Sequence, residues 1–407
     1  MRILATAFCC KPNSGSESAF AWWWATTTAQ DHDVTVITVE AQRERIEAEM
    51  ADRDDLDRLK FVYVKGPDEV SASGSSHRFE RLHQYLWQLR AIPTARRLAR
   101  KWRPDAAQHV STGTWRQPSC LAFTNLNFAM GPLAGSEELP AKFARHFGMR
   151  AFLWESFRSS LIRVARIDPL VRFTLRRADI IIASGRATYV EMRRKYPGKT
   201  VSRTRAFAHP DIDPAAVEVA SHRAGEPLKL VWVGRLVPTK GLDLLLEAMT
   251  DDRLSGVTVD VLGTGPGAEG HRRRAAQLGV RERVSFRGHV DQATLFSTIR
   301  SSHVFVFTSL QELMGQSLSE AMQLGAACVI YDWSGASVLA GEHGAAKVRV
   351  GVPKTAASDL ADVLADIQDS GGVAELQDRA LKRISELTDM DTVRRQRDEL
   401  LTQLANS

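Results

Sequence analysis

Short, continuous apolar segments recur along the chain, and a longer segment with helical periodicity separates each one from the next. Continuous apolar strands are typical of parallel sheets that are buried on both faces. The pattern therefore predicts an α/β protein built on parallel sheets. The predicted strands form two series, which are Ile3–Ala7, Val34–Val39, Phe61–Val64, Ala106–Val110, Phe128–Met130 and Ile180–Ala183, followed by Leu228–Val233, Val257–Leu262, Val284–Phe286, Val304–Phe307 and Cys328–Tyr331.

The two series of strands indicate two domains. A chain of 407 residues is long for a single hydrophobic core. Residues 208–227 lie between the series, contain several Pro and Gly residues, and are predicted to be a linker. We expect two doubly wound, Rossmann-like domains at residues 1–207 and 228–388 that face each other across a cleft. Residues 389–407 are expected to form a C-terminal helix that could cross back to the first domain.

The composition is that of an ordinary globular protein, with 44% hydrophobic and 25% charged residues. The formal net charge of +6 is modest, although residues 141–205 contain sixteen Lys or Arg and only four acids. That stretch lacks a recognition motif, so nucleic acid is not expected as a partner. DNA binding with a steep salt dependence would instead indicate a nucleic-acid-binding protein.

Cysteine use and hydropathy indicate a cytoplasmic protein. The four cysteines have no metal-ligand spacing and are expected to be reduced thiols, with Cys9 and Cys10 as buried small residues. Charged residues follow the first strand too soon for a signal peptide. No uncharged apolar run reaches the roughly eighteen residues that a membrane-spanning helix needs. At most, we expect surface contact with a membrane.

The segment from Thr308 to Ser337 carries the clearest chemical signal. Two carboxylates, Glu312 and Glu320, follow the apolar strand Val304–Phe307, with Gly315 between them and a helix expected to start near Ser317. Doubly wound sheets bind ligands at the carboxyl ends of their strands, and a helix N-terminus there suits a phosphate. The segment therefore predicts a site for a ligand with hydroxyls and phosphates. Ser317-x-x-Glu320 also fits a capping box, with Ser317 as N-cap.

A second signal opens the second domain. The strand Leu228–Val233 runs into Gly234, which is expected to allow a sharp turn, and Arg235 and Lys240 follow. A guanidinium and an ammonium group together could neutralise a diphosphate leaving group with no metal present. The alternative is a surface Arg and Lys after an ordinary turn. The segment VLGTGPG at Val261–Gly267 departs from the dinucleotide fingerprint and is interpreted as a tight strand-to-helix turn.

Taken together, these segments resemble retaining glycosyltransferases of family four, which have the GT-B fold. The second domain carries the family's GR-x4-KG turn (Gly234 to Gly241), a V-x-F-x-G-x-V strand (Val284 to Val290) and the Glu-x7-Glu pair. In the first domain, KPNSGSESAFAWWWA looks like the family's Pro-x2-Gly-Ser-Glu loop, and QHVSTGTWRQPS and GPLAGSE match segments common in polysaccharide-type members. The resemblance covers essentially the whole chain.

The resemblance implies a role for each matching residue. Arg235 and Lys240 would bind the donor diphosphate, Glu312 would hold the sugar near its reacting carbon, and Glu320 would hold the ribose hydroxyls. His109 would lie on the sugar and acceptor side and act with these catalytic groups. The remaining donor-binding residues would be Gly15, Gly234, Gly315, Gln316 and Ser317. The reaction would retain the anomeric configuration and need no metal or other cofactor, so the nucleoside diphosphate sugar is the co-substrate.

Two departures bear on the donor sugar. Family members often read Glu-Gly-Phe-Gly-Leu-Pro after the first acid, whereas this chain reads Glu312-Leu313-Met314-Gly315-Gln316-Ser317. The family's later Gly-x-Pro is Gly325-Ala326-Ala327. Backbone amides could still bind phosphate, but the shape of the sugar pocket has changed. The sequence therefore leaves the sugar, the base, the acceptor and the linkage open.

Some of these residues also fit purely structural interpretations. His109 in isolation fits a packed histidine at a strand end, and Glu17 and Glu137 fit carboxylates at helix starts.

Two other functions remain as alternatives to the glycosyltransferase, whose expected setting is cell-surface polysaccharide synthesis. One is a sugar phosphorylase or synthase of the same fold, and the other is a non-catalytic scaffold that binds nucleotide sugars.

The segment Ala141–Val164 has two interpretations. Its residues Phe143, Phe147, Trp154, Phe157, Leu161 and Val164 make one helical stripe with arginines around it. A basic amphipathic helix with aromatics can lie in an anionic membrane interface, which predicts peripheral contact of residues 141–166 with the inner face of the cytoplasmic membrane. A lipid-linked acceptor would favour this contact. The stripe could also pack on the domain or cover the acceptor pocket, and a break at Gly148 would divide it into two helices.

Overall fold

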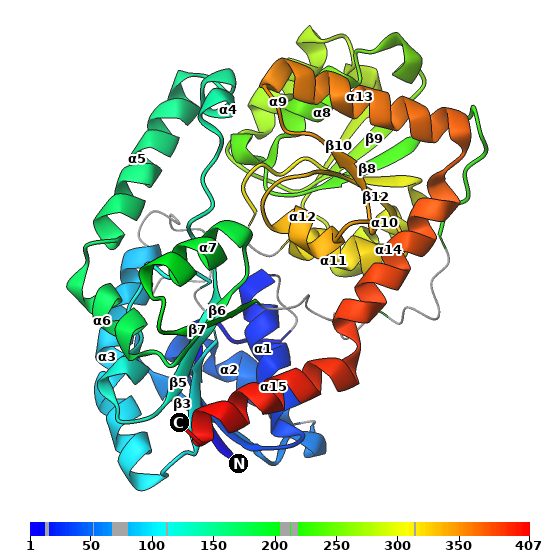
Figure 1. Ribbon diagram of the computed structural model, residues 1–407. Coiled ribbons are helices and arrows are strands. Elements are labelled where there is room, and N and C mark those ends of the chain that lie inside the picture. Colours follow the sequence, from blue (N-terminus) through cyan, green and yellow to red (C-terminus); the bar gives the residue numbers. More distant parts are fainter. Residues whose placement is uncertain are drawn as a thin grey trace. The chain divides into compact units, whose positions relative to one another are not determined.

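The computed structural model in Figure 1 describes residues 1–12, 16–51, 53–66, 80–110, 113–203, 212, 219–312 and 315–407. The chain forms two compact units. The first comprises Met1–Ser136, Ser159–Thr204 and Met390–Ser407, and the second comprises Glu137–Arg158 and Arg205–Asp389. Each unit contains a parallel sheet with hydrophobic core packed against it.

The sheet of the first unit is doubly wound. Its strands are β1 (Arg2–Thr6), β2 (Asp33–Val39), β3 (Leu59–Val64), β4 (Ala106–His109), β5 (Phe128–Leu133), β6 (Ile180–Ala183) and β7 (Thr200–Arg203). Their order is β3-β2-β1-β4-β5-β6-β7, and neighbouring strands are parallel. The order reverses between β1 and β4, and doubly wound sheets bind ligands at the carboxyl ends of the strands at such a point.

Helices of the first unit cover both faces of its sheet, so alternate strand residues are buried on either face. The helices are α1 (Ser16–Ala29), α2 (Arg43–Ala51), α3 (Glu80–Lys101), α6 (Pro169–Arg177), α7 (Arg186–Lys195) and α15 (Met390–Ala405), with the end of α5 (Met149–Ala165). Apolar residues of α3 and α6 share a core with Leu4, Ile37 and Ile181. The alternate strand residues, such as Ile3 and Val36, are buried as well, and α1 and α15 contact β2 and β4.

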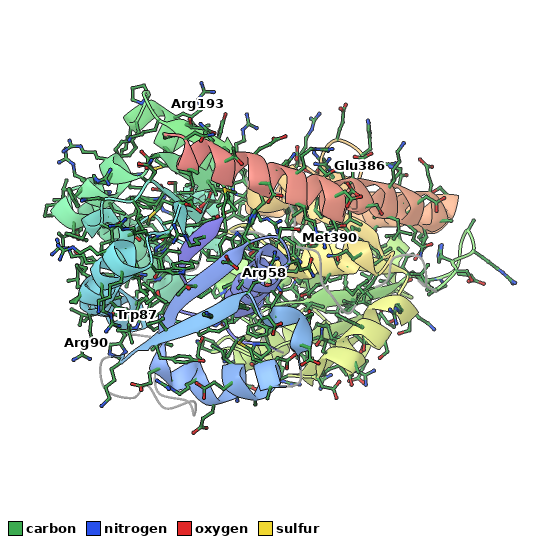
Figure 2. All side chains as sticks on the ribbon, turned by 90° about the horizontal axis from the view of Figure 1, so that it is seen from below. Arg58, Trp87, Arg90, Arg193, Glu386 and Met390 are labelled. Atoms are coloured by element: carbon green, nitrogen blue, oxygen red, sulfur yellow. The ribbon has the colours of Figure 1, made fainter. Side chains whose placement is uncertain are left out.

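Two residues of α3, labelled in Figure 2, hold the end of β3 and the residues that follow it. The indole Nε1 of Trp87 donates a hydrogen bond to the Val64 carbonyl at 3.1 Å, and the ring is fully buried. The Arg90 guanidinium donates to the Gly66 carbonyl at 2.9 Å. The tryptophan therefore has both a buried apolar body and a satisfied polar atom.

The last helix, α15, begins at Met390 (Figure 2) and packs within the first unit. The largely buried Arg397 donates hydrogen bonds to Asp31 Oδ2 at 2.6 Å and to the Thr27 carbonyl at 2.8 Å. His32 Nε2 lies 3.0 Å from Asp398 Oδ1. Leu401 and Leu404 are fully buried. These contacts attach α15 to the end of α1.

The second unit repeats the doubly wound pattern. Its strands are β8 (Lys229–Val233), β9 (Thr258–Leu262), β10 (Val284–Gly288), β11 (Val304–Phe307), β12 (Ala327–Tyr331) and β13 (Ala346–Val348). Their order is β10-β9-β8-β11-β12-β13, with neighbouring strands parallel. This is the 3-2-1-4-5-6 order of dinucleotide-binding folds, and it reverses between β8 and β11.

Both faces of the second sheet are covered. The helices are α4 (Ala141–His146), α8 (Leu242–Ala248), α9 (Ala268–Gln277), α10 (Gln292–Ser301), α11 (Gln316–Gln323), α12 (Ser334–Ala340), α13 (Pro353–Ser370) and α14 (Val373–Thr388), with the start of α5. Along β11, Val304 and Val306 face the core under α8 and α13, whereas Phe305 and Phe307 face the core under α10, α11 and α12. This alternation explains why β11 is apolar at every position.

The structure confirms the predicted α/β architecture with two parallel, Rossmann-like sheets. The eleven predicted strands are present, with ends that differ by up to three residues. The strands β7 and β13 were not predicted. Both lie at an edge of their sheet, where a strand is paired on one side only.

The compact units depart from the predicted domain boundaries. The sequence assigns residues 137–158 to the first domain, but they pack with the second unit. Most of the predicted linker 208–227 lies outside the described residues. Its described end is packed rather than free, because the Ala220 amide donates to the Arg300 carbonyl and the Gly225 amide to the Gln368 carbonyl, both at 2.8 Å.

The break at Gly148, which was one of the alternatives for residues 141–164, is confirmed, so the aromatic residues do not form one continuous stripe. Gly148, with φ +92°, separates α4 from α5. Phe143 is fully buried in the core of the second unit and Phe147 packs against it, whereas Phe157 is 55% exposed on α5. The two helices therefore present their aromatic residues to different surroundings. Within the described part of the chain, no helix is both long and apolar enough to cross a membrane.

Candidate functional site

The loop after β8 is held against the end of β11. The Thr308 hydroxyl accepts a hydrogen bond from the Trp232 indole at 2.9 Å and donates one to the Lys240 carbonyl at 2.8 Å. The Leu310 amide donates to the Thr239 carbonyl at 3.0 Å. Gly241 has a φ of +69°, and a Cβ there would lie 2.3 Å from the Thr308 carbonyl oxygen. The loop therefore needs glycine at 241 to bring Lys240 beside β11.

Lys240 and Glu312 form a direct ion pair through Nζ and Oε2. Their side chains are 25% and 14% exposed, so the ion pair is partly buried but still accessible to solvent. The two residues come from the loops after β8 and β11, which flank the reversal of strand order. The structure thus brings together two of the residues predicted for catalysis, and it does so at the edge where doubly wound sheets bind ligands.

Arg235 adds a second positive charge to the same loop. The residue follows Gly234 directly and is exposed. Within the part of the chain that the structure describes, its guanidinium makes no hydrogen bond or ion pair with protein. An exposed guanidinium with five donors is suited to a phosphate group. Arg235 and Lys240 together make this loop positive at the carboxyl edge of the sheet.

Gly263, and not the predicted turn residue Gly234, has the backbone conformation that favours glycine. Gly234 does not have a positive φ. Gly263 has a φ of +133°, and a Cβ there would lie 2.0 Å from the Gly234 carbonyl oxygen. The Leu236 amide donates to the Thr264 carbonyl, and the Gly267 amide donates to the Leu236 carbonyl, both at 2.9 Å. The VLGTGPG segment therefore forms the strand-to-helix turn that was predicted, and it packs against the Arg235 loop.

Helix α11 begins two residues earlier than the capping-box interpretation requires. Its N-cap is Gly315, with φ +65° and no side-chain cap, and Gln316 is the first helical residue. Glu320 accepts a hydrogen bond from the Gln316 amide group at 3.1 Å. Ser317 lies inside the first turn. The capping box is therefore absent, and the first amides of α11 lie just after the Glu312 loop.

Burial changes the acidity of Glu320. Desolvation raises its pKa to about 7, although the hydrogen bond from Gln316 opposes this shift. A carboxyl that titrates near neutral pH can exist in both forms under ordinary conditions. Perturbed carboxyls of this kind are frequent in binding and catalytic sites. The surroundings of Glu320 thus differ from those of Glu312, which forms an ion pair with Lys240.

Gln311, which the sequence did not single out, links the site to residues 137–158. Its side-chain Nε2 donates a hydrogen bond to the Glu137 carbonyl at 3.0 Å. Farther along this segment, His146 Nε2 lies 3.2 Å from Glu247 Oε1 on α8. Glu137 itself is buried and lies four residues before α4, so the interpretation as a helix-start carboxylate is wrong. No local sequence signal could reveal a contact across 174 residues.

The first-unit residues lie at the corresponding edge of the other sheet. His109 ends β4, is buried, and has its Nδ1 3.1 Å from the Ser119 hydroxyl. Thr114 pairs with Ala134, and the Trp115 indole donates to the Ser136 hydroxyl at 2.9 Å. Residues 114–115 and 134–136, which belong to the two predicted segments, are thus joined after β4 and β5. Gly15 and the side chain of Glu17 lie outside the described residues.

The comparison with known families agrees with this site. Residues 217–383 match the model of the family Glycosyl transferases group 1. This range contains Arg235, Lys240, Glu312 and Glu320. The matched residues lie within the second unit, and the match agrees with the resemblance to family-four glycosyltransferases.

Curated relatives match the chain in part. A D-inositol 3-phosphate glycosyltransferase of Streptomyces avermitilis is 28% identical over 247 residues, which is 56% of this chain and 50% of that protein. A GDP-mannose-dependent alpha-(1-6)-phosphatidylinositol monomannoside mannosyltransferase of Mycolicibacterium smegmatis is 31% identical over 131 residues, or 32% of this chain and 33% of that protein. The chain spans half or less of the length of these relatives.

Solved structures match over the full length. Sucrose-phosphate synthase from Thermosynechococcus elongatus has a TM-score of 0.67 and 15% identity, and the match covers 100% of both chains. HepE of Anabaena, in complex with UDP and glucose, has a TM-score of 0.63 and 16% identity over 98% of this chain and 99% of its own. At such identities the likeness establishes the fold alone, which is GT-B.

Proposed function

We propose that the protein is a retaining glycosyltransferase that uses a nucleoside diphosphate sugar. It moves the sugar to a hydroxyl of a glycan or glycolipid acceptor in cell-surface polysaccharide synthesis. The observation that carries this proposal is the Lys240–Glu312 ion pair at the reversal of strand order, with Arg235 on the same loop. The two cations at this sheet edge suit the diphosphate of the donor, and the carboxylate suits the hydroxyls of its sugar.

Each side chain has a definite task in the proposed reaction. Arg235 and Lys240 bind the diphosphate and stabilise the negative charge that grows on it as the bond from the anomeric carbon to the phosphate oxygen breaks. Glu312, beside Lys240, accepts hydrogen bonds from sugar hydroxyls. The acceptor hydroxyl forms the new bond to the anomeric carbon on the same face, and its proton passes to the departing diphosphate. The products are the glycoside and a nucleoside diphosphate.

The remaining groups hold the rest of the donor. Glu320, with Gln316 beside it, binds the ribose hydroxyls, and the amides of Gly315, Gln316 and Ser317 at the start of α11 bind phosphate oxygens. Gly234 belongs to the loop that approaches the diphosphate, Gly15 approaches it from the first unit, and His109 serves the sugar and acceptor side. Because Arg235 and Lys240 supply the positive charge, the proposal includes no metal cofactor.

The names of the relatives point to the chemistry of the acceptor. One relative is named for D-inositol 3-phosphate and another for a phosphatidylinositol monomannoside. Both acceptors are polyols with a phosphate, and the second is a lipid. We include in the proposal an acceptor of this kind, glycan or lipid-linked, and a cytoplasmic protein with peripheral contact at the membrane through residues 141–166.

Nucleotide binding tests the proposal at its centre. Calorimetric titration with UDP, GDP and ADP in buffer with EDTA should give a micromolar Kd for one of them. Lys240→Ala should weaken that binding at least about tenfold, or about 1.4 kcal/mol. Lys354→Ala is the matched control, because Lys354 is an exposed lysine on α13 in the same unit, and it should leave Kd unchanged.

The outcomes separate the glycosyltransferase from its alternatives. If none of the three nucleotides binds at millimolar concentration to protein with a native circular dichroism spectrum, the donor site is not where we place it. If a nucleotide binds but its sugar conjugate is never turned over with any acceptor, the scaffold function is favoured. With a working donor, the anomeric configuration of the product by NMR tests retention, and release of sugar phosphate with orthophosphate would indicate a phosphorylase.

A further inference from the structure

One buried hydroxyl connects the core of the second unit to the backbone of Lys240. The Trp232 indole Nε1 lies 2.9 Å from Thr308 Oγ1, which lies 2.8 Å from the Lys240 carbonyl oxygen. An indole N–H can only donate and a carbonyl can only accept. The Thr308 hydroxyl therefore accepts from the indole and directs its own proton to Lys240, so the chemistry of the three groups fixes the direction of both hydrogen bonds.

Both hydrogen bonds are shielded from water. Thr308 is 1% exposed and Trp232 is 2% exposed. The Trp232 ring belongs to an apolar core that also contains Val306 and Leu310. Polar groups are costly to bury in such surroundings unless each one is satisfied, and a satisfied buried network holds its members in one arrangement. The backbone group that this network holds is the Lys240 carbonyl.

The same tryptophan contacts the start of the loop that carries the two cations. A Cβ on Gly234 would lie 3.0 Å from Cη2 of the Trp232 ring, so the ring lies against the residue that precedes Arg235. At the other end of the loop, Thr308 holds the Lys240 carbonyl. Trp232 thus supports one end of the loop directly and the other end through the Thr308 hydroxyl.

Thr308 also lies on the segment that carries Glu312. Both residues follow β11, and the Lys240 ammonium group pairs with the Glu312 carboxylate. The hydrogen bond from Thr308 to the Lys240 backbone therefore sets how closely the two loops approach, and with that the position of the ammonium group. Because Glu312 holds the sugar in the proposed reaction, the phosphate that faces Lys240 is the one that bears the sugar.

We propose that Thr308 and Trp232 are positioning residues for the phosphate contact of Lys240. Because both side chains are buried, they act through the lysine rather than on the donor itself. A lysine that starts from a fixed backbone loses less conformational freedom when it binds, which increases affinity. The inference rests on the proposed function, since it requires Lys240 to bind the sugar-bearing phosphate of a nucleoside diphosphate sugar.

Paired nucleotide titrations test this role. The probes are whichever of UDP, GDP and ADP the wild type binds, and the monophosphate of the same nucleoside, which lacks the sugar-bearing phosphate. Thr308→Val should weaken diphosphate binding at least about fivefold, because the Lys240 carbonyl loses its buried donor, and should change the monophosphate Kd by less than about twofold. Thr308→Ser keeps the hydroxyl and should bind the diphosphate within about twofold of the wild type.

A double-mutant cycle with Lys240→Ala separates positioning from general support of the fold. If Thr308 acts through the lysine, Thr308→Val should weaken diphosphate binding much less in the Lys240→Ala protein than in the wild type. Thr388→Val is the matched control, because the Thr388 hydroxyl also donates to a backbone carbonyl, that of Ile384 at 2.9 Å, on α14 of the same unit. This control should leave both Kd values unchanged.

Urea unfolding shows whether each variant is folded under the titration conditions. If Thr308→Val is not, Trp232→Phe takes its place, because it removes the indole donor that orients the hydroxyl, and it should weaken diphosphate binding about threefold while it spares the monophosphate. Equal losses for the two nucleotides, or an undiminished loss in the Lys240→Ala protein, would overturn the proposal. If Lys240→Ala itself leaves the diphosphate Kd unchanged, the proposed donor site fails too, so the two failures are distinguishable.

Discussion

Glu320 shows how a single side chain acquires a property that its sequence neighbourhood does not reveal. The spacing Ser317-x-x-Glu320 indicates a capping box, but the N-cap is Gly315, two residues before the position that this motif needs. The side chain of Glu320 consequently meets Gln316 rather than its expected N-cap, and burial raises its pKa to about 7. The identity of the capping residue, a left-handed glycine, decides the outcome.

The raised pKa predicts a pH dependence of nucleotide binding. Above pH 7 Glu320 is a carboxylate, and hydrogen bonds from ribose hydroxyls to an ionised acceptor are about twice as strong as those to a neutral one. We expect the affinity for the nucleotide to rise between pH 6 and pH 8 by up to about tenfold. Glu320→Gln should remove this rise, while it keeps any titration that belongs to the phosphates of the nucleotide itself.

The same group affects the stability of the unliganded protein in the opposite direction. Its folded pKa of about 7 lies above the ordinary glutamate pKa of 4.5, so its stabilising contribution is complete below about pH 4.5 and is lost as pH rises through 7. The shift corresponds to up to about 3 kcal/mol. Urea unfolding of the wild type and of Glu320→Gln at pH 5 and pH 8 measures the difference. Identical pH dependence in both proteins would contradict the assignment.

At the scale of elements, the β8–α8 loop depends on one glycine. Gly241→Ala adds a Cβ that would lie 2.3 Å from a backbone oxygen of Thr308, at a φ of +69°. We expect a loss of at least about 3 kcal/mol in the free energy of unfolding, since backbone must move as well as adopt a strained φ. Nucleotide binding should weaken too, because Lys240 is the preceding residue. Urea unfolding and calorimetry measure the two effects.

Gly279 supplies the matched control for this substitution. Its φ of +72° is nearly the same, but a Cβ there would meet nothing within 4 Å. Gly279→Ala should therefore cost only the conformational strain of about 1 kcal/mol and leave the Kd of the nucleotide unchanged. Equal losses in the two variants would mean that the contact with Thr308 does not constrain the loop.

The strands with the clearest sequence signal are the buried ones. The strands β1, β8 and β11 are covered on both faces, so nearly every position is apolar and the pattern is unmistakable. The edge strands β7 and β13 read Thr-Val-Ser-Arg and Ala-Lys-Val, which lack that continuous signal. Their strand conformation comes from pairing with β6 and β12, a contact that local composition does not express.

At the scale of the whole molecule, the two sheets belong to separate units. We therefore predict that a bound nucleotide stabilises mainly the second unit. Binding to the folded state stabilises it by about 2.7 kcal/mol when the ligand is at 100 times Kd. We expect hydrogen exchange to slow in peptides that cover 230–246 and 304–323. Peptides from β2 and β3 should be unchanged. Protection that is equal across both units, or that persists in Lys240→Ala, would contradict the placement of the donor on the second unit.

The path of the chain between the units is also a property of the whole molecule. Residues 137–158 leave the first unit to pack on the second, and residues 390–407 return to the first. The first of these segments reaches Gln311, which precedes the predicted carboxylate Glu312. Such contacts depend on which surfaces meet after folding, and residues 137–158 carry an aromatic pattern that suits several surfaces equally well.

The sequence by itself determined the architecture and the chemistry of the donor edge. Buried parallel strands must be apolar at almost every position, and cations and carboxylates that follow two adjacent strands must meet at one edge of the sheet. Only the tertiary structure decided that Lys240 and Glu312 are paired and that residues 137–158 pack with the second unit. These outcomes depend on distances between residues far apart in the chain, and local pattern contains no measure of such distances.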